Sequence, residues 1–261
     1  MLVVVCPGQG SQTPGFLAPW LELPEFAQSL DAMSVASGID LAAHGTTSDA
    51  DTIRDTKIAQ PLIVGAGVAT LAALQSGGFS GFAGVAGHSV GEVTASVAAG
   101  IFTPETGIRF VAKRGAEMAE AAAKTATSMA AVLGGDSAEV AAYLMSLGLT
   151  PANYNGGGQI VAAGSVEGIA KLQAEPLEGT KVIPLQVAGA FHTSYMEPAV
   201  AALSEFAESL EVRDPAVKIW TNSNGTTIAS GGDYLASLVS QVSNPVRWDL
   251  CMASMLEAGV T

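Results

Sequence analysis

The chain has 261 residues, of which 49% are hydrophobic and 13% charged, and its 24 acidic and 11 basic side chains give a formal net charge of −13. This length allows a full α/β core, whereas the acidic charge excludes a nucleic acid partner, because binding DNA or RNA needs clustered lysine and arginine. Two cysteines are too few for a disulfide framework or a thiolate zinc site, so we expect no metal, a reducing compartment and a cytoplasmic location.

Strands and helices alternate at both ends of the chain. Strands are predicted at residues 2–6, 82–86 and 217–221, with helical segments between them. This alternation is typical of a mostly parallel sheet that is covered by helices on both faces. We therefore predict a large α/β domain made of residues 1–126 and 189–261.

No segment predicts a membrane span or a signal peptide. The longest apolar region, residues 61–74, is interrupted by Gly65 and Gly67 and is too short to cross a bilayer. Residues 1–7 lack a basic region and are too short for a signal peptide. We therefore expect a protein without a membrane partner.

The second strand leads into the segment Gly87-His88-Ser89-Val90-Gly91, which is followed by helix-compatible residues 90–99. A G-x-S-x-G segment between a strand and a helix is typical of a nucleophile elbow. The two glycines allow a tight turn, and the Val90 N–H at the helix N-terminus can face a developing oxyanion. The pentapeptide can also arise by chance in a chain with 30 glycines, but its position makes Ser89 the candidate nucleophile.

A helix is predicted to begin at Thr103, its N-cap, and Pro104, its first residue. Arg114 falls on the apolar face of this helix, three residues after Val111 and four before Met118. A guanidinium on such a face needs an anionic partner, because an unpaired buried charge costs about 3 to 5 kcal/mol. Two partners remain open: a substrate carboxylate held bidentately, or an acidic side chain of the protein itself.

The pattern changes after residue 126. It reads strand, helix, strand, strand, helix, strand over residues 129–133, 137–147, 151–155, 159–163, 166–174 and 181–185. A βαββαβ order is that of a ferredoxin-like unit. We therefore predict a small ferredoxin-like subdomain, residues 127–188, inserted into the large domain, with the active site in the cleft between the two.

A serine nucleophile needs a general base, and the three histidines are His44, His88 and His192. The residue before the nucleophile of an elbow points away from it, which disfavours His88. His44 lies in a polar stretch that reads as a solvated loop. By elimination the base is His192, which follows an apolar segment and opens a helical pattern. The alternative is that His192 is a surface residue at a helix N-terminus.

Five motifs together carry a family resemblance. They are Pro7-Gly8-Gln9-Gly10-Ser11-Gln12, Gly87-His88-Ser89-Val90-Gly91-Glu92, Lys113-Arg114-Gly115, Ala190-Phe191-His192 and Asn244-Pro245-Val246-Arg247-Trp248. In this order they resemble the malonyl-CoA:acyl carrier protein transacylases along the whole chain. The resemblance implies transfer of a malonyl group from malonyl-CoA to the phosphopantetheine thiol of acyl carrier protein. We also expect an α/β-hydrolase-like large domain and a monomer without a cofactor.

The resemblance also implies the catalytic residues. Ser89 is the nucleophile that carries the acyl group, and His192 is its base. The backbone N–H groups of Gln9 and Val90 form the oxyanion hole. The backbone carbonyl of Gln241 orients His192, so that no acidic third member is required.

Further residues are implied to bind the substrate. Arg114 is the clamp for the malonyl carboxylate, and Gln60 and Asn155 match positions that line the family's pocket. Met118, on the same helix face as Arg114, is placed with them. Phe191 favours malonyl over methylmalonyl units because its ring fills the space that an α-methyl group needs; a core aromatic is the alternative.

Two other classes of protein remain open. A serine hydrolase or thioesterase would share the elbow and the histidine, and a catalytically silent module could bind carrier proteins. Members of the resembled family continue past the position of Thr261 with another strand, so either the sequence is truncated or this protein lacks that strand.

Overall fold

Three parallel strands form the first of two β-sheets. The computed structural model describes residues 1–260, and β1 (Val3–Cys6), β2 (Gly84–Gly87) and β7 (Lys218–Ile219) pair in the order β1-β2-β7. Both pairings are parallel. The four residues of β2 are buried, as expected for the central strand of a parallel sheet. The three predicted strands are therefore confirmed, although β7 is shorter than residues 217–221.

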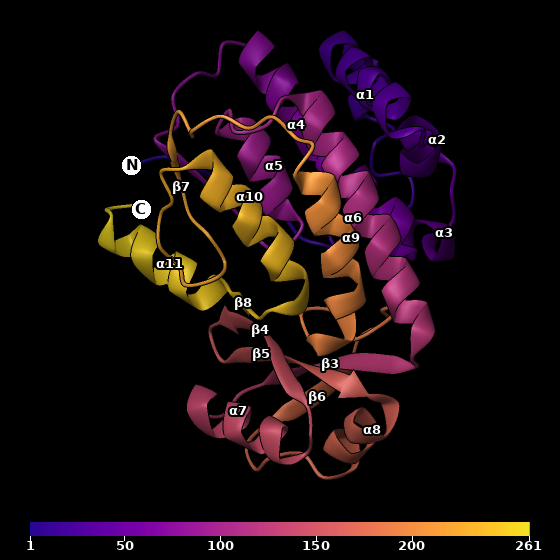
Figure 1. The fold of residues 1–261 in the computed structure, drawn as a ribbon, viewed down its shortest axis with the longest axis vertical. Helices are drawn as coiled ribbons and strands as arrows, with labels where there is room; N and C mark the ends of the chain where they lie inside the picture. The colour runs from indigo at the N-terminus through magenta and orange to yellow at the C-terminus, as the bar shows by residue number, and fades with distance from the viewer. Residues whose placement is uncertain (261) are drawn as a thin grey trace.

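Helices surround this sheet and make most of the upper body in Figure 1. They are α1 (Pro24–Ser37), α2 (Leu41–Thr46), α3 (Ala50–Arg54), α4 (Thr56–Ser76), α5 (Gly91–Ala98), α6 (Pro104–Lys124), α9 (Glu197–Ala207), α10 (Gly231–Ser240) and α11 (Trp248–Glu257). The start of α6 is as predicted: the Thr103 hydroxyl accepts the Thr106 N–H, and Pro104 is the first helical residue. Helix α6 packs against α1, α4 and α9, and their apolar faces form the large core.

Helix α4 is longer than its sequence suggested. It has 21 residues, begins at the Asp55 cap and continues through Pro61. The statement that this region is too short for a bilayer is therefore wrong: by length and composition α4 could cross a membrane. In this fold, however, 56% of its apolar stretch is buried, and α4 packs between other helices of the large core.

The second sheet has five strands and lies below the helical body in Figure 1. Its strands are β3 (Thr127–Leu133), β4 (Thr150–Gly156), β5 (Gln159–Ser165), β6 (Lys181–Pro184) and β8 (Val246–Arg247), in the order β6-β3-β5-β4-β8. With α7 (Ser137–Ser146) and α8 (Val166–Ala174), the elements from β3 to β6 follow the predicted βαββαβ order. Strand β8 was not predicted; it comes from the Asn-Pro-Val-Arg motif and pairs in parallel with β4.

The alternation of side chains along the strands gives the second sheet two different faces. In β3, Ala130 and Val132 belong to the small core that α7 and α8 cover. Met129 and Ala131, which alternate with them along the strand, point to the opposite face and line a cavity beneath the helical body. The sheet is thus a wall shared by the small core and the cavity.

One local prediction is wrong. His44 is not in a solvated loop but in the last turn of α2, a helix capped by the Asp40 side chain, which accepts the Ala43 N–H. Its Nδ1 lies 3.0 Å from the Ser48 hydroxyl. The short polar sequence hid the helix because Asp40 and Leu41 provide the cap and the buried anchor outside the polar stretch.

Candidate active site

Ser89 sits on a strained turn between β2 and α5. Its φ is +52°, in the left-handed region that non-glycine residues rarely adopt. A Cβ on Gly87 would collide with the backbone of Gly91, and a Cβ on Gly91 would collide with the Cys6 carbonyl. The close approach of these segments requires both glycines, and the predicted elbow geometry is present.

His192 contacts the serine. Its Nε2 lies 2.8 Å from Ser89 Oγ, and its Nδ1 lies 2.8 Å from the backbone carbonyl of Gln241. Because that carbonyl can only accept, Nδ1 carries the proton and Nε2 is free to accept from the serine. His192 also has a positive φ, +61°, and its N–H donates to the Val242 carbonyl. The sequence-predicted pair is therefore together in space, with the expected orienting carbonyl.

The environment keeps the imidazole neutral. Burial and, to a smaller extent, the nearby Arg114 charge lower the pKa of His192 to about 3, against a contribution from the Gln241 hydrogen bond that raises it. A neutral imidazole at neutral pH can accept a proton, which is the state that a general base needs.

This depressed pKa predicts an unusual pH dependence. The rate of reaction of Ser89 with a fluorophosphonate should change less than about twofold from pH 7 to pH 5, whereas a histidine with pKa ~6.5 would lose roughly 30-fold at pH 5. Below about pH 6.5 the unfolded chain binds this proton and the folded chain does not. The free energy of unfolding therefore falls by about 1.4 kcal/mol for each unit by which the pH is lowered in that range. The rates must therefore be measured well below the melting temperature. A tenfold loss with its midpoint near pH 6.5 would contradict the prediction.

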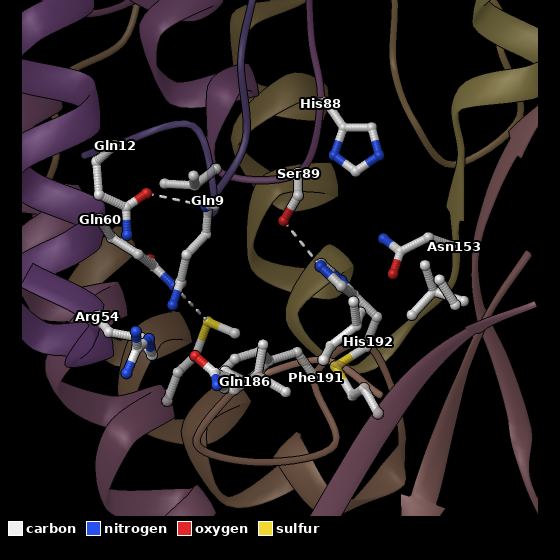
Figure 2. A pocket seen from close by; sticks show the side chains of 18 of the residues that line it. Gln9, Gln12, Arg54, Gln60, His88, Ser89, Asn153, Gln186, Phe191 and His192 are labelled. Atoms are coloured by element: carbon white, nitrogen blue, oxygen red, sulfur yellow. Dashed lines mark hydrogen bonds between the residues drawn. The ribbon is translucent and has the colours of Figure 1, made fainter. Parts of the chain in front are cut away.

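The other two histidines do not contact the serine. His88 Nε2 lies 2.8 Å from Asn155 Oδ1, and the Asn155 amide donates to Gln159 Oε1. Figure 2 shows the Ser89 contact running to His192 and not to His88. His88 instead joins the elbow to β4 of the second sheet.

Ser89 and His192 open into a cavity of about 490 Å³ between the helical body and the second sheet. Seven amide side chains line it, together with apolar groups and the half-buried Arg54, which is labelled in Figure 2. The lining includes the predicted residues Gln9, Gln60, Val90, Met118, Asn155 and Phe191, and further Gln12, Arg54, Asn153, Gln159 and Gln186. No acidic side chain lines it. The cavity therefore suits a ligand with amide groups and a negative charge.

The two residues predicted to form an oxyanion hole, Gln9 and Val90, both line the cavity that contains Ser89. Val90 is also the N-cap residue of α5. The Ser89 N–H, in contrast, is already engaged, because it donates to Asn222 Oδ1 at 2.7 Å. The Ser89 N–H is therefore not free to donate to a reacting carbonyl.

Arg114 is completely buried and its neighbours are not those weighed from the sequence. Its Nη1 donates to Gln60 Oε1 at 2.7 Å and its Nη2 to Gln241 Oε1 at 2.9 Å. Among residues 1–260 it forms no salt bridge, and its Nε has no partner. Burial lowers the pKa of Arg114 to about 10, and Glu92 opposes this shift, so the guanidinium is charged at neutral pH. Gln60, but not Arg114, lines the cavity.

Two residues of the site were missed by the sequence analysis. Asn222 holds the elbow, and Glu92 is a fully buried carboxylate behind it. Glu92 lies within a quoted motif but received no role. Asn222 lies three residues after the end of β7. Side chains just past the carboxyl ends of parallel strands commonly line sites, so this position could have identified it.

A serine on a strained strand-to-helix elbow, paired with a histidine at a cavity, is the arrangement shared by enzymes that transfer or hydrolyse acyl groups. The family described as "Acyl transferase domain" matches residues 3–260. The chain therefore belongs to the acyl transferase domain family.

Similar proteins narrow this class. The chain is 46% identical over 266 residues to the malonyl CoA-acyl carrier protein transacylase of Mycobacterium tuberculosis, covering 100% of this chain and 87% of the relative. The Escherichia coli protein of the same name is 32% identical over 263 residues, covering 98% and 85%. The family resemblance drawn from the five motifs is thus confirmed.

Solved structures of similar fold belong to the same group of enzymes. The crystal structure of MCAT from Mycobacterium tuberculosis has a TM-score of 0.95 at 44% identity, covering 99% of this chain and 86% of that one. A malonyl-transacylase in complex with a type II polyketide synthase acyl-carrier protein has a TM-score of 0.94 at 30% identity, with coverages of 99% and 86%. The fold is therefore the mixed α/β fold of these enzymes.

Proposed function

We propose that this chain transfers a malonyl group from malonyl-CoA to the phosphopantetheine thiol of acyl carrier protein through an ester on Ser89. The observation that carries the proposal is the 2.8 Å contact between Ser89 Oγ and His192 Nε2 in a cavity backed by a buried arginine. The relatives named above bear this activity in their names, which supports the same assignment here.

In the first half-reaction Ser89 Oγ attacks the thioester carbonyl while His192 Nε2 takes the hydroxyl proton. The Gln9 and Val90 N–H groups stabilise the oxyanion. The C–S bond then breaks, and His192 returns the proton to the departing coenzyme A thiol. The Gln241 carbonyl stabilises the imidazolium that forms in between. The product is the malonyl ester of Ser89.

In the second half-reaction the carrier thiol attacks that ester. His192 takes the thiol proton and later returns it to Ser89 Oγ as the ester bond breaks, so the enzyme is regenerated without a cofactor. Four of the seven amides in the cavity already bond within the protein. Those of Gln9, Asn153 and Gln186 are available for the two amides of the phosphopantetheine arm, which both half-reactions share. Water must be kept from the ester for transfer to exceed hydrolysis.

Arg114 binds the malonyl carboxylate in this proposal. The guanidinium carries five N–H donors, of which Gln60 and Gln241 occupy two. Because Gln60 stands between Arg114 and the cavity, the carboxylate would reach the guanidinium by displacing the Gln60 amide. Gln60, Met118, Asn155 and Phe191 form the remaining wall of the acyl site.

Replacing Arg114 with alanine should lower kcat/KM for malonyl transfer by about ten- to a hundredfold, the range of a charged hydrogen bond. Acetyl transfer should fall much less, since an acetyl group has no carboxylate. The quantity to measure is the ratio of the two specificity constants in one preparation, because the fraction of folded protein cancels from it. Equal loss for both substrates would mean that Arg114 is only structural.

The decisive assay supplies malonyl-CoA with and without acyl carrier protein in its phosphopantetheinylated form. Transfer predicts malonyl-carrier protein and little free malonate. A serine hydrolase would release malonate at the same rate whether or not the carrier is present. A silent binding module would give no acyl-enzyme by mass spectrometry.

We also propose the finer architecture and setting. Residues 1–126 and 189–261 make an α/β-hydrolase-like catalytic domain, and residues 127–188 make a ferredoxin-like subdomain, which the β6-β3-β5-β4 strand order supports. The enzyme acts as a monomer in the cytoplasm, where both of its proposed substrates are found in solution.

A further inference from the structure

Glu92 is a buried acid that the mechanism above does not use. It lies in the first turn of α5, three residues after Ser89, and none of its surface is exposed. Its two oxygens have different partners. Oε1 accepts the Asn222 N–H at 2.6 Å, and Oε2 accepts the Gln241 side-chain amide. Each of these partners reaches a different part of the candidate site, and a longer contact of 3.3 Å from the Gln241 amide to Asn222 Oδ1 also joins them to each other.

The first branch runs through Asn222 to the nucleophile. The Asn222 side chain accepts the Ser89 N–H at 2.7 Å and donates to the Gly87 carbonyl at 2.8 Å. It therefore holds the backbone on both sides of His88, at the point where the elbow turns. Since Ser89 has φ +52°, these two bonds stabilise a conformation that the residue does not favour alone.

The second branch runs through Gln241 to both other functional residues. Its side-chain oxygen accepts from Arg114 Nη2 at 2.9 Å, and its backbone carbonyl faces His192 Nδ1 at 2.8 Å. Arginine can only donate, so the amide oxygen must face Arg114 and the amide nitrogen must face Glu92. A carboxylate at residue 92 therefore fixes the orientation of Gln241.

The hydrogen-bond geometry also favours a carboxylate, because both Glu92 oxygens accept from N–H groups, which can only donate. Burial raises the pKa of Glu92 to about 8, and the Asn222 N–H, the Arg114 guanidinium and the side chains of Thr221 and Tyr234 keep it from rising further. Burying a charged group costs less free energy when an opposite charge is buried nearby. Here the Gln241 amide joins the buried guanidinium of Arg114 to the buried carboxylate of Glu92.

We propose that Glu92 is a positioning residue that sets the nucleophile through Asn222 and sets both the base and the carboxylate-binding arginine through Gln241. The part concerning Arg114 rests on the proposed function. One buried carboxylate thereby couples acyl recognition to acyl transfer. Glutamine at this position cannot replace it, because its amide nitrogen would face either the Asn222 N–H or the Gln241 amide, which are both donors.

The test compares Glu92→Gln with Val93→Ala, which creates a cavity at the next buried residue of α5 without touching the hydrogen-bonded network. Two quantities are measured at a temperature where thermal unfolding shows both variants folded: the rate of Ser89 labelling by a neutral fluorophosphonate, and the malonyl-to-acetyl ratio of kcat/KM. Glu92→Gln should lower each by about tenfold or more, the scale of a misplaced catalytic group. Val93→Ala should lower neither.

Wild-type values of both readouts in Glu92→Gln would overturn the proposal, and so would a change in only one, because both branches are required. Equal losses in Val93→Ala would also overturn it. If the wild-type protein failed to transfer malonyl groups, the proposed function would fall, but the labelling rate would still decide whether Glu92 positions the nucleophile.

Variants of the two branches decide the question if Glu92→Gln does not fold. Asn222→Ala should slow fluorophosphonate labelling by about tenfold without lowering the malonyl-to-acetyl ratio. Gln241→Met, which keeps the backbone carbonyl, should lower that ratio by about tenfold. If the two variants gave the same pattern, the separate branches, and the proposal with them, would be refuted.

Discussion

Ser89→Ala is expected to abolish malonyl transfer, with a loss of more than roughly 10³-fold in kcat. Alanine has no oxygen to carry the acyl group, so the ester cannot form and the carrier thiol has no acyl-enzyme to attack. Incubation of the wild-type protein with malonyl-CoA alone should give a covalent malonyl adduct, and peptide mass spectrometry should place it on Ser89. The variant should give no adduct.

The fold should survive this substitution. Alanine keeps the Cβ and the positive φ of residue 89 and leaves the Asn222 bond to its N–H in place, so the free energy of unfolding should change by less than about 1 kcal/mol. Loss of activity can then be attributed to the missing hydroxyl. A malonyl adduct on another residue, or normal turnover by the variant, would overturn the assignment of the nucleophile.

His192→Ala is expected to slow the acylation of Ser89 by about 10² to 10⁴-fold, the usual contribution of a positioned general base. The reason is the 2.8 Å contact to Ser89 Oγ, without which the hydroxyl proton has no acceptor. The measurement is single-turnover formation of the acyl-enzyme by rapid quench, since steady-state rates could hide the step in product release.

His88→Ala is the matched control for that experiment. His88 is adjacent to the nucleophile and lines the same cavity, but its imidazole contacts Asn155 and not Ser89. Its loss should slow acylation far less than loss of His192. If His88→Ala slowed acylation more than His192→Ala, the assignment of His192 as the base would be wrong, because the histidine without a contact to Ser89 would then matter more.

The nucleophile could be predicted from the sequence because its geometry is local. The turn at Ser89 depends on two glycines within two residues of it, and both can be recognised directly in the sequence. His192 followed by elimination from only three histidines. The βαββαβ order could be predicted for a similar reason, since each of its strands and helices shows its own periodicity in the sequence.

The partners of Arg114 could not be predicted in the same way. Its position on an apolar face implied burial, and the structure bears this out, but the sequence offered only acids as partners. The observed partners are two glutamines, 54 and 127 residues away in the chain. Amides are common, and nothing local marks which of them a distant guanidinium will meet. Strand β8 was missed for a related reason, since two residues that complete a sheet carry no period of their own.

The left-handed backbone at Ser89 and His192 links the loss of activity to a gain in stability. Each such residue costs about 1–3 kcal/mol, against a total of about 5–15 kcal/mol for a typical fold. Glycine adopts this conformation without that strain. Its greater conformational freedom in the unfolded chain takes back about 0.5–1 kcal/mol of the gain in stability. At His192 this gain is offset, because glycine would also remove a buried side chain and leave the Gln241 carbonyl without its partner. At Ser89 the side chain contributes only its contact to His192, so Ser89→Gly should raise the free energy of unfolding while it abolishes acyl transfer. The strained backbone at Ser89 is thus a feature that serves catalysis and not folding.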